Sequence, residues 1–595
     1  MKLLIPYVGR MEPVDIRLGH LADFLGIECE ALALDEPAQE HVKSLKGCAF
    51  AGNCCLVVNP SVIKKWTKGS LPSGLAQFLR SRFPYVLLYN PHADAFDGTL
   101  IARLSGGRFR GVEAIGRSVP YSVSTESRDV CEAFAGITFG PANPANDQVF
   151  QSGPAALEAR NLISIGGNPF MSALQYEGNT ILFVGSSDVI DLNAEADEQL
   201  AGYFSRFLPF AMVLRHVFGE ESWRPGQGYA CVIVDDPLLR RNYGFLNYNA
   251  LLRMMEECNF HTTIGFIPHN CRRSSAEIAR MFRENSARFS LCVHGNDHTG
   301  AEFATIDKAL LHSMLQIAEH RMRIHREKTG ISCERVMVFP QGKFSAEAMS
   351  VLQSLSFDCA VNTASSARQS ASCLTIGELA QPALLRYSGF PLFLRSRSAA
   401  ITCQDIAFSL FFGKPVFLVE HHDAFKDPKT LVEAVSRINV VAPDICWTNV
   451  GEATANSLWR RRMDNNEYQI RGYCQTVRIA NHADFPARFA VEWTRVADGA
   501  TVKAVLSDGE SSGLVDLDER RVRAVFELAP QTSRKLSLSY ANSPSSWASP
   551  GVQRTVRAFV RRRLSEVRDN YLSRNQLMLT FANIIHRSLS HKDSR

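Results

Sequence analysis

The sequence predicts a multidomain α/β protein, and three observations support this prediction. The chain has 595 residues, too many for one hydrophobic core at roughly 150 residues per domain. Short apolar runs alternate with helical patterns over most of its length. From about residue 468 to residue 540, apolar and polar residues alternate instead, as in half-buried strands. We therefore expect an N-terminal doubly wound parallel-sheet domain (1–222), a central barrel of seven or eight β/α units (223–464), a small β-sandwich (465–545) and a basic helical tail (546–595).

The composition is that of a globular protein. Hydrophobic residues make up 46% and charged residues 21%, which excludes disordered, collagen-like and coiled-coil classes. No run of about 18 apolar residues predicts a membrane-spanning helix, and the start of the chain meets Pro6 and charged residues too early for a secretory signal. The 15 cysteines are scattered without a Cys-x-x-Cys pair, as expected for reduced thiols. We expect a cytoplasmic protein.

In the first domain, apolar runs that end in Gly, Asn or Pro predict buried strands, and periodic segments between them predict helices. The strands are expected at residues 2–7, 54–59, 85–89, 162–166 and 180–184, and the helices at 15–25, 74–82 and 195–218. No phosphate-binding glycine loop and no nucleophile elbow follows a strand. Residues 179–194 resemble the last strand and loop of class I glutamine amidotransferase-like domains. Without the nucleophile, we expect a role in regulation or assembly.

After a linker at 223–228, a second strand–helix series begins. Its strands are expected at residues 229–234, 262–267, 289–293, 335–339, 359–361, 392–394, 416–419 and 445–448. Its helices are expected at 248–258, 274–285, 307–328, 346–355 and 430–440, with Ser274 and Glu277 as a capping box. Such a series is typical of a (β/α) barrel, in which the carboxyl ends of all strands meet at one mouth.

The tail concentrates the positive charge of the chain. Residues 553–595 hold 10 Lys and Arg against 3 Asp and Glu, whereas the other 552 residues hold 55 against 57. Helical spacing over residues 552–589 carries Arg561, Arg562 and Arg563. Two interpretations stay open, an anionic membrane surface as partner or a solvated helix packed on its own protein. We expect no nucleic acid partner, and the sequence leaves the oligomeric state open.

Three of the expected barrel strands end in groups that can do chemistry. They run into Asp235-Asp236-Pro237, into His294-Gly295-Asn296-Asp297-His298 and into Glu420-His421-His422-Asp423. At a common mouth, one Asp oxygen and two His nitrogens form a three-ligand set for a divalent metal with an open position. The metal activates water and polarises a carbonyl, a second carboxylate takes the proton of the water, and another histidine protonates the leaving group. This combination predicts metal-assisted acyl hydrolysis.

The order Asp-Asp, His-x-x-x-His and a late His-Asp resembles the polysaccharide deacetylases of the glycoside hydrolase/deacetylase barrel superfamily, over residues 229–456. The resemblance implies a deacetylase-like barrel that hydrolyses an acylated sugar, most simply an N-acetylated one, or a related small amide. It implies Asp235 as general base and His422, or His421 beside it, as catalytic acid. The metal ligands that it implies are Asp236, His294 and His298. The implied metal is zinc, with cobalt, nickel or iron as alternatives.

The chain departs from the family pattern at four places. Pro237 stands where Gly is usual, and Gly295 stands where Ser or Thr is usual. Residues 338–342 lack the Arg that orients the base, and residues 361–365 lack the usual Asp and Trp. Further residues expected near the mouth are candidate substrate contacts: Tyr243, His269, Pro340 and Gln341.

Three functions therefore stay open at this point. The first is a metal-dependent hydrolase of C–N bonds other than peptide bonds, which the complete ligand set favours. The second is a catalytically inactive, deacetylase-like binding or assembly protein, which the missing Arg and the altered fourth motif favour. The third is a glycosidase with Asp235 and Asp423 as its two carboxylates, and it leaves the histidines unexplained.

Overall fold

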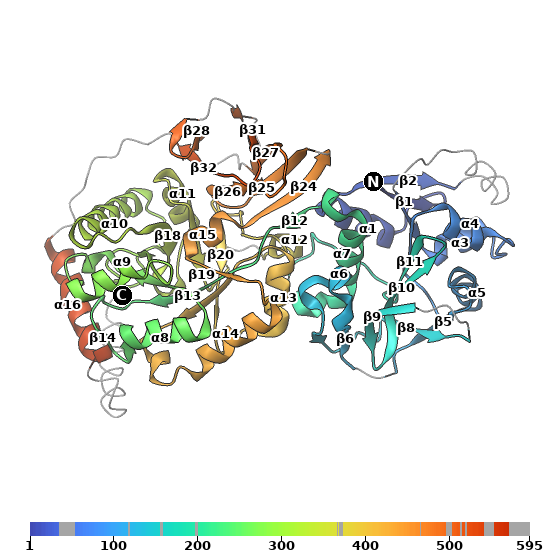
Figure 1. The fold of residues 1–595 in the computed structure, drawn as a ribbon, viewed down its shortest axis with the longest axis horizontal. Helices are drawn as coiled ribbons and strands as arrows, with labels where there is room; N and C mark the ends of the chain where they lie inside the picture. The colour runs from blue at the N-terminus through green and yellow to red at the C-terminus, as the bar shows by residue number, and fades with distance from the viewer. Residues whose placement is uncertain are drawn as a thin grey trace.

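The computed structural model confirms a mixed α/β protein with a nearly closed parallel barrel (Figure 1). It describes residues 1–34, 54–116, 119–154, 159–196, 200–365, 367, 373–464, 466–494, 502–511, 515–517, 521–540 and 552–570. Figure 1 shows the N-terminal domain on the right, the barrel on the left and the β-sandwich above the barrel. In the part of the chain described, no helix is long and apolar enough to cross a membrane.

The N-terminal domain is built on a nine-stranded sheet with the order β2-β1-β3-β4-β11-β10-β9-β6-β7. Its strands are β1 (Lys2–Tyr7), β2 (Glu28–Ala33), β3 (Cys54–Val58), β4 (Tyr85–Leu88), β6 (Tyr121–Val123), β7 (Thr138–Phe139), β9 (Ala159–Ile165), β10 (Asn168–Tyr176) and β11 (Asn179–Val184). The sheet is parallel from β2 to β11 and antiparallel from β11 to β7. The expected all-parallel sheet is therefore wrong in its second half. Gly166 and Gly167, both with positive φ, make a tight turn that folds β9 back on β10.

Helices cover both faces of the parallel half, because alternate strand residues point to opposite sides. Leu3 and Ile5 share a core with α1 (Pro13–Phe24) and α7 (Phe204–Phe218). Leu4 belongs to a second core on the other face, under α3 (Pro60–Trp66), α4 (Leu75–Arg82) and α5 (Ala95–Leu104). The helix expected at 195–218 is shorter in the structure, since α7 begins at Phe204 after the 3-10 turn η3 (Leu200–Tyr203); residues 197–199 lie outside the described residues.

The central domain is the expected barrel. Its strand order is β20-β19-β18-β17-β16-β13-β22-β21, with every neighbouring pair parallel. The strands are β13 (Tyr229–Asp235), β16 (Thr262–Phe266), β17 (Phe289–His294), β18 (Glu334–Val338), β19 (Cys359–Asn362), β20 (Leu392–Leu394), β21 (Ser396–Arg397) and β22 (Val416–Glu420). The two end strands, β20 and β21, are separated in the chain by Arg395 alone. Arg395 therefore lies where the two ends of the nearly closed sheet follow each other in the chain.

Helices surround this barrel (Figure 1). They include α8 (Tyr248–Cys258), α9 (Ala276–Glu284), α10 (Lys308–Thr329), α11 (Ala346–Ser354), α13 (Cys403–Phe411), α14 (Lys429–Val441) and α15 (Val450–Ala455). The capping box expected at Ser274 and Glu277 is wrong by one residue. Ser275 is the N-cap of α9 and accepts a hydrogen bond from the backbone N–H of Ile278 (3.3 Å), whereas the Ser274 hydroxyl lies 2.9 Å from Nε2 of His325.

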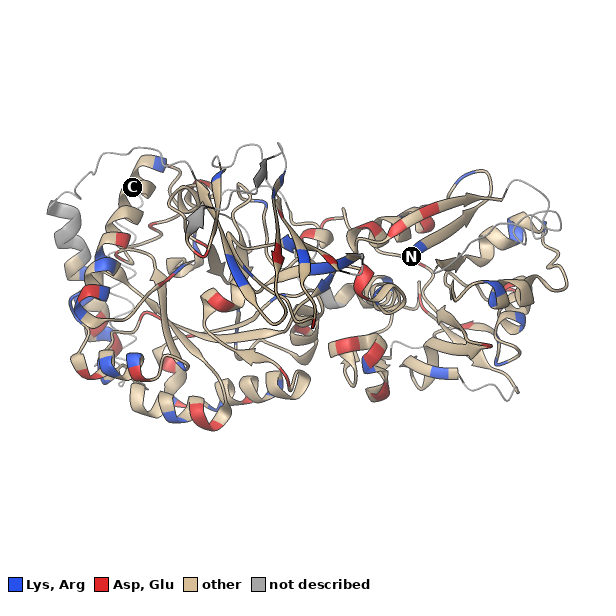
Figure 2. Ribbon diagram, turned by 45° about the horizontal axis from the view of Figure 1, so that its top comes forward, with Lys and Arg blue, Asp and Glu red and all other residues tan. Residues whose placement is uncertain are grey.

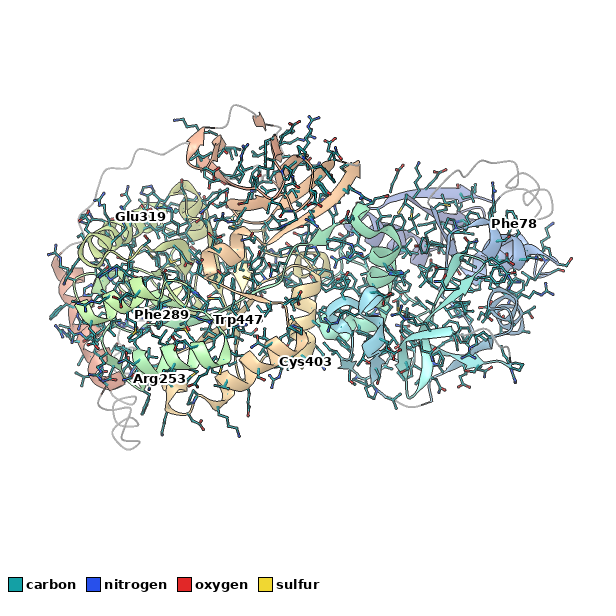
Figure 3. The ribbon with its side chains drawn as sticks, viewed as in Figure 1. Phe78, Arg253, Phe289, Glu319, Cys403 and Trp447 are labelled. Atoms are coloured by element: carbon teal, nitrogen blue, oxygen red, sulfur yellow. The ribbon has the colours of Figure 1, made fainter. Side chains whose placement is uncertain are left out.

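The barrel packs directly against the N-terminal domain. Helix α13, which begins at Cys403 (Figure 3), lies against the turn η2 (Glu132–Phe134). The ring of Phe134 lies 5.4 Å, centroid to centroid, from the rings of both Phe408 and Phe411. These aromatic contacts belong to one core that continues from α1 into the barrel.

Two sheets with a common core follow the barrel. The first has the order β12-β24-β25-β27-β31-β30 and the second β26-β32-β28-β29. Their strands are β12 (Arg224–Pro225), β24 (Leu458–Asp464), β25 (Glu467–Gly472), β26 (Thr476–Ala480), β27 (Ala487–Thr494), β28 (Val502–Ser507), β29 (Glu510–Ser511), β30 (Val515–Leu517), β31 (Arg521–Leu528) and β32 (Ser533–Tyr540). This sandwich-like unit begins at Leu458, earlier than the expected boundary, and the segment expected to be a linker supplies β12.

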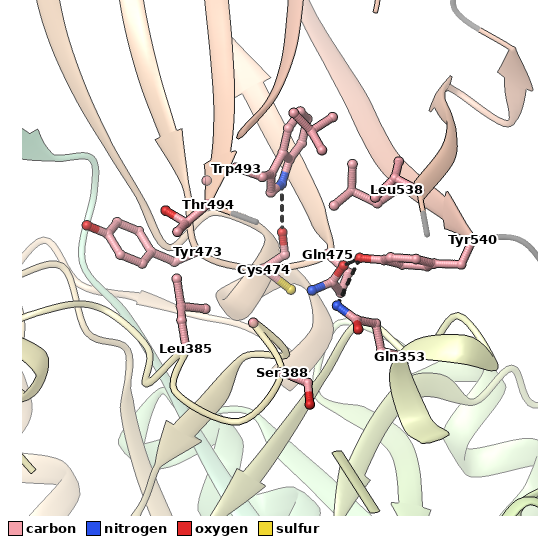
Figure 4. Close-up of a pocket in the computed structure, with 14 residues that line it drawn as sticks. Gln353, Leu385, Ser388, Tyr473, Cys474, Gln475, Trp493, Thr494, Leu538 and Tyr540 are labelled. Carbon is pink, nitrogen blue, oxygen red and sulfur yellow. Dashed lines mark hydrogen bonds between the residues drawn. The ribbon is translucent and has the colours of Figure 1, made fainter. Parts of the chain in front are cut away.

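The sandwich is held on the barrel by polar contacts (Figure 4). Gln353 of α11 donates a hydrogen bond to the Tyr540 hydroxyl (3.4 Å), which in turn donates to Gln475. Arg478 of β26 donates to both carboxylate oxygens of Glu452 on α15 (2.9 Å each), whereas the bond from Trp493 to the carbonyl of Cys474 (3.0 Å) lies within the sandwich.

The last described element is α16 (Val552–Asn570), which lies along the outside of the barrel near β14 (Asn242–Tyr243) and α9 (Figure 1). The remainder of the helix expected at 552–589 lies outside the described residues. Helix α16 is thus packed on its own protein.

Candidate metal centre at the barrel mouth

The carboxyl ends of neighbouring barrel strands bring the candidate residues to one mouth. Asp235 ends β13 and His294 ends β17, while His421 directly follows β22. In the parallel pair β13–β22, Ile233 is opposite Val419. Residues opposite each other in a parallel pair point to the same side, and the backbone at His421 is still extended (φ −120°, ψ 174°). Asp235 and His421, each two residues further on, therefore share the inner side of the barrel.

Asp236, His294 and His298 form a compact cluster, called the triad below. The Oδ1 atom of Asp236 lies 3.4 Å from Nε2 of His294 and 3.2 Å from Nε2 of His298. One ligand atom from each residue lies within 4.8 Å of the others. Four ligands about 2.0–2.1 Å from a tetrahedral metal lie about 3.3 Å apart, so these spacings suit zinc. The buried Oδ1 atom of Asp236 has no hydrogen-bond partner among the described residues. Because buried polar atoms normally have a partner, this atom suits a metal ligand.

Local backbone geometry directs the triad side chains. Asp236 and His298 both have positive φ, 81° and 55°, a conformation that costs energy in a residue with a Cβ. Nδ1 of His294 lies 3.0 Å from the carbonyl oxygen of Val338. Because a carbonyl can only accept, Nδ1 carries the proton and Nε2 offers its lone pair to the centre of the triad.

The loop that follows His294 and contains His298 is fixed by Glu302. Its carboxylate accepts the backbone N–H groups of Asn296 (2.8 Å), Asp297 (3.1 Å) and His298 (3.1 Å). Gly295 has φ +66°, and a Cβ there would overlap both Glu302 and Pro340. Gly295, which stands where the family pattern usually has Ser or Thr, is thus required here because a larger residue would not fit. Pro340, a candidate substrate contact, is buried against Gly295 instead.

Arg321 and His269 also contact this loop. Arg321 donates to Asn296 (2.7 Å) and to the carboxylate of Asp297. Nδ1 of His269 lies 3.3 Å from Asp297. His269 is thus placed beside the ligand loop and paired with Asp297.

Asp235 is held by an arginine that the sequence analysis missed. Arg395 donates from Nη1 to Oδ1 (2.9 Å) and from Nη2 to Oδ2 (2.6 Å), and both side chains are at most 4% exposed. Burial opposes ionisation of the Asp235 carboxyl, but Arg395, together with the imidazoles of His294 and His421, holds its pKa below the ordinary value. The signal was present in the sequence, because Arg395 also follows a short apolar strand, as the acidic and histidine groups do.

The two adjacent histidines after β22 have different surroundings. His421 is half-buried on the side of Asp235. Nε2 of His422 lies 3.5 Å from Oδ1 of Asp569, and its Nδ1 is so close to Gly244 that a Cβ there would lie 2.3 Å from it. The structure thus places His421 next to the buried carboxylate and His422 in contact with α16.

Helix α16 covers the mouth with polar side chains. Asp569 accepts a hydrogen bond from the Tyr243 hydroxyl (2.8 Å), and Asn570 accepts one from the backbone N–H of Gly244 (2.8 Å); each pair is 326 residues apart. Glu566 is bound by both terminal nitrogens of Arg273. Tyr243, a candidate substrate contact, is buried under this helix.

Arg562 of α16 lies beside the triad. Burial opposes ionisation of the Asp236 carboxyl, but the triad imidazoles and the Arg562 guanidinium hold its pKa well below the ordinary value. Arg562 is 4% exposed. The sequence identified the arginines of the tail but gave no sign that one of them reaches the mouth.

Two other candidates are not brought into the cluster. Gln341 is exposed next to Pro340, and Asp423 is exposed in the turn η7 (His422–Lys426). Within the described part of the chain, neither forms a hydrogen bond or ion pair with the triad or with Asp235.

Comparison with known proteins gives fold likenesses only. No family model matches the chain, and no curated protein matches it. Among solved structures, it is similar to Agd3, described as a novel carbohydrate deacetylase (TM-score 0.48, 10% identity, 91% of this chain and 99% of that chain covered). It is also similar to a putative polysaccharide deacetylase from Mycobacterium smegmatis (0.27, 13%, 38% and 92%). A third likeness is to a family 4 carbohydrate esterase from Streptomyces lividans (0.22, 12%, 37% and 91%). The function proposed next therefore rests on the residues at the mouth.

Proposed function

We propose that the barrel mouth is the divalent-metal centre of a hydrolase that removes an acyl group from an amide nitrogen. The substrate class is an N-acetylated sugar or a related small amide. One observation carries this proposal: a three-ligand Asp-His-His set lies beside a second, buried carboxylate that an arginine keeps ionised. Zinc suits the ligand types and spacing best, and cobalt, nickel or iron accept the same ligands.

Asp236, His294 and His298 would hold the metal. A divalent metal bound there would lower the pKa of a bound water molecule and polarise the substrate carbonyl. The neutral imidazoles present Nε2, and the hydrogen bond from Nδ1 of His294 to Val338 fixes the required tautomer. Glu302 keeps the ligand loop in place through its three backbone contacts.

The remaining groups divide the proton transfers between them. Asp235 accepts a proton from the attacking water as the new C–O bond forms at the acyl carbon. Arg395 keeps that carboxylate ionised and oriented. His421 donates a proton to the amide nitrogen as the C–N bond breaks, so the products are a carboxylate and an amine. His421 is preferred over His422 because it lies on the side of Asp235, whereas Nε2 of His422 is directed to Asp569.

The first test is metal content, measured by mass spectrometry on protein purified without chelators. We expect about one metal ion per wild-type chain, and loss of that ion in His294→Ala/His298→Ala. A matched control is Glu319→Gln on α10 (Figure 3), which removes an exposed pair with Arg335 at the opposite end of the barrel. Wild-type protein that binds no metal even after zinc is added contradicts the proposal.

The second test is release of acetate from acetylated amino sugars. Asp235→Asn should keep the metal and lose about 10²–10⁴-fold in turnover, because the proton acceptor is gone. Acetate release at the wild-type rate by Asp235→Asn would remove the assigned base. Metal binding without any release of acetate would favour the inactive, binding interpretation.

A further inference from the structure

Helix α16 has its polarity reversed with respect to the protein that it covers. Its buried stripe is Arg562, Glu566 and Asp569. Val560, Leu564 and Val567 have the same spacing on the other side, and they are 49%, 62% and 46% exposed. A surface helix of a globular protein normally buries its apolar stripe and exposes its polar one. In α16 the polar stripe is anchored on the barrel mouth and the apolar stripe is left in solvent.

We propose that this outward face docks on the surface of an anionic lipid bilayer. Its apolar part, called the outward stripe, consists of Val560, Leu564 and Val567, all at least 46% exposed. Phe559, which is 52% exposed, lies on the same helix beyond Arg563, toward the buried stripe. Among the described residues, the other exposed large apolar side chains belong to separate segments: Ile16, Ile306, Leu310, Val440, Met463 and Phe485. The outward stripe is therefore a contiguous apolar surface, of the kind that marks an interaction site.

Basic side chains flank the outward stripe. At 100° per residue, Arg563 lies on one edge of it and Arg568 on the other, with 55% and 44% of their side chains exposed. Arginines recur along α16 at the left edge of Figure 2. Residues 553–595 carry a net charge of +7 (10 minus 3), while the other 552 residues carry −2 (55 minus 57). An apolar stripe between arginines on a strongly basic segment suits the headgroup region of an anionic bilayer.

Other partners fit this face less well. A second copy of the chain would need about 800 Å² of contact on each side, more than three side chains on a single helix provide. A nucleic acid would use the arginines and leave the apolar stripe in water. Lying in the plane of the interface also agrees with the length and composition of α16, since no described helix is suited to cross a bilayer.

The two faces of α16 link the bilayer to the mouth. The inward face is bonded to Arg273, Tyr243 and Gly244 through Glu566, Asp569 and Asn570. A bilayer bound to the outward stripe then lies about one helix diameter, about 10 Å, from the triad. The site would therefore lie close to molecules held at the lipid surface, at the far side of α16 from them.

The test is flotation of the full-length chain with lipid vesicles. Wild-type protein should float with vesicles of phosphatidylglycerol and phosphatidylcholine, but not with phosphatidylcholine alone, and less so as salt is raised. Val560→Ser/Leu564→Ser/Val567→Ser should bind at least about tenfold more weakly, because it removes the apolar part. Arg563→Gln should bind about fivefold more weakly. Val440→Ser, which changes an exposed apolar residue on α14, is the matched control and should bind as the wild type does.

Three outcomes overturn the proposal: no flotation of the wild type with anionic vesicles, equal flotation of the triple variant, or self-association that the triple variant abolishes. Thermal unfolding of the triple variant checks its fold, and the changed residues are all exposed. The assay uses neither metal nor substrate, so its result is independent of the proposed hydrolase function.

Discussion

At the scale of single residues, the buried ion pair between Asp235 and Arg395 has the most stringent requirement for a matched partner. Both side chains are buried, and each guanidinium nitrogen that faces the carboxylate donates to a different oxygen. A buried carboxylate is tolerated when such a partner compensates for lost hydration, and it becomes costly when the partner is removed. The pKa of Asp235 is lower in the folded protein than in the unfolded chain. The pair therefore stabilises the fold fully at a pH above the pKa of an unfolded Asp, and this stabilisation is lost as the pH falls through the lower pKa of folded Asp235.

Arg395→Gln should therefore destabilise the protein by about 3–5 kcal/mol at neutral pH, measured by urea unfolding. In this variant Asp235 gains stability by taking up a proton, so the deficit relative to the wild type should shrink as the pH is lowered. Arg462→Gln is the control, because its ion pair with Glu220 is half exposed and worth at most about 1 kcal/mol. A deficit that does not depend on pH would show that Arg395 acts through packing alone.

The neighbouring histidines 421 and 422 give a second prediction at this scale. His421→Gln should lower turnover by about 10²-fold or more and leave the Michaelis constant nearly unchanged, because it removes a proton donor. His422→Gln should have a much smaller effect on turnover, since Nε2 of His422 lies against Asp569 of α16. The measurement is steady-state acetate release. The reverse order of effects would assign the proton donor to His422.

Sequence reasoning was strongest for residues that end a strand. Acidic and histidine groups after an apolar run could be assigned to the mouth because barrel topology sends every strand end there. Arg395 was missed because a single arginine after the short run 392–394 does not by itself indicate a metal ligand or a proton-transfer group. Which of His421 and His422 points inward depends on how far the backbone stays extended, and the spacing of residues does not reveal this.

At the scale of elements, the loop between β17 and α10 determines the geometry of the triad. It starts directly after His294, the last residue of β17, and contains His298, and its backbone is held by one carboxylate, that of Glu302. Glu302→Gln retains the size of the side chain but replaces one accepting oxygen with a donor. In the wild type, two backbone N–H groups share Oε1 of Glu302 and a third binds Oε2. The variant has one accepting oxygen instead of two, so at least one of these contacts is lost.

We expect Glu302→Gln to bind zinc about 10–100-fold more weakly than the wild type, because support of the ligand loop is weakened. Competition with a chromophoric chelator measures this affinity. Glu319→Gln, which lies on α10 and is paired with Arg335, should leave the affinity unchanged. Unaltered zinc affinity in Glu302→Gln would mean that the loop keeps its shape without this carboxylate.

Most elements could be predicted from periodicity, and the failures have local causes. Seven of the barrel strands and helices α8, α10 and α14 lie within a few residues of their expected positions. The strand expected at 445–448 is β23 (Cys446–Trp447), which pairs with β13 but lies outside the ring, and the eighth strand of the ring, β21, was not expected. The antiparallel half of the N-terminal sheet was missed because β9 and β10 are joined by a two-glycine turn, which was interpreted as the end of a parallel strand. The N-cap of α9 differs by one residue because two serines adjoin, and only the structure shows that Ser274 bonds His325.

At the scale of the whole molecule, buried histidines predict how stability depends on pH. Burial lowers the pKa of His261 and of His325 from 6.5 to about 4. Both are neutral in the folded protein, whereas the unfolded chain binds protons below pH 6.5. Stability should therefore fall between pH 6.5 and 4, by on the order of 2–3 kcal/mol for each histidine.

Thermal unfolding at pH 7 and pH 5 measures this dependence. His261→Gln should flatten the curve relative to the wild type, because one of the two buried groups no longer titrates. His312→Gln, on the surface of α10, is the control. A wild-type midpoint that stays constant over this pH range would contradict the prediction.

Changes in periodicity predicted that alternating strands follow the β/α units, but they did not predict the position of the tail. Helix α16 lies on residues that precede it by 326 positions, and no local pattern identifies such a partner. The sequence revealed its charge and its helical spacing. Its docking by the polar face, with the apolar face outward, depends on complementary groups at the mouth, namely Arg273 and Tyr243.

This arrangement sets an order of events during synthesis. All groups of the mouth up to His422 leave the ribosome before α16, whose last described residue, Asn570, follows 148 positions later. At about 5–20 residues per second, that interval lasts roughly 7–30 s. During this time the nascent barrel can fold with its mouth uncovered. A cation can then reach the triad directly from the surrounding solution, before the final helix docks over it.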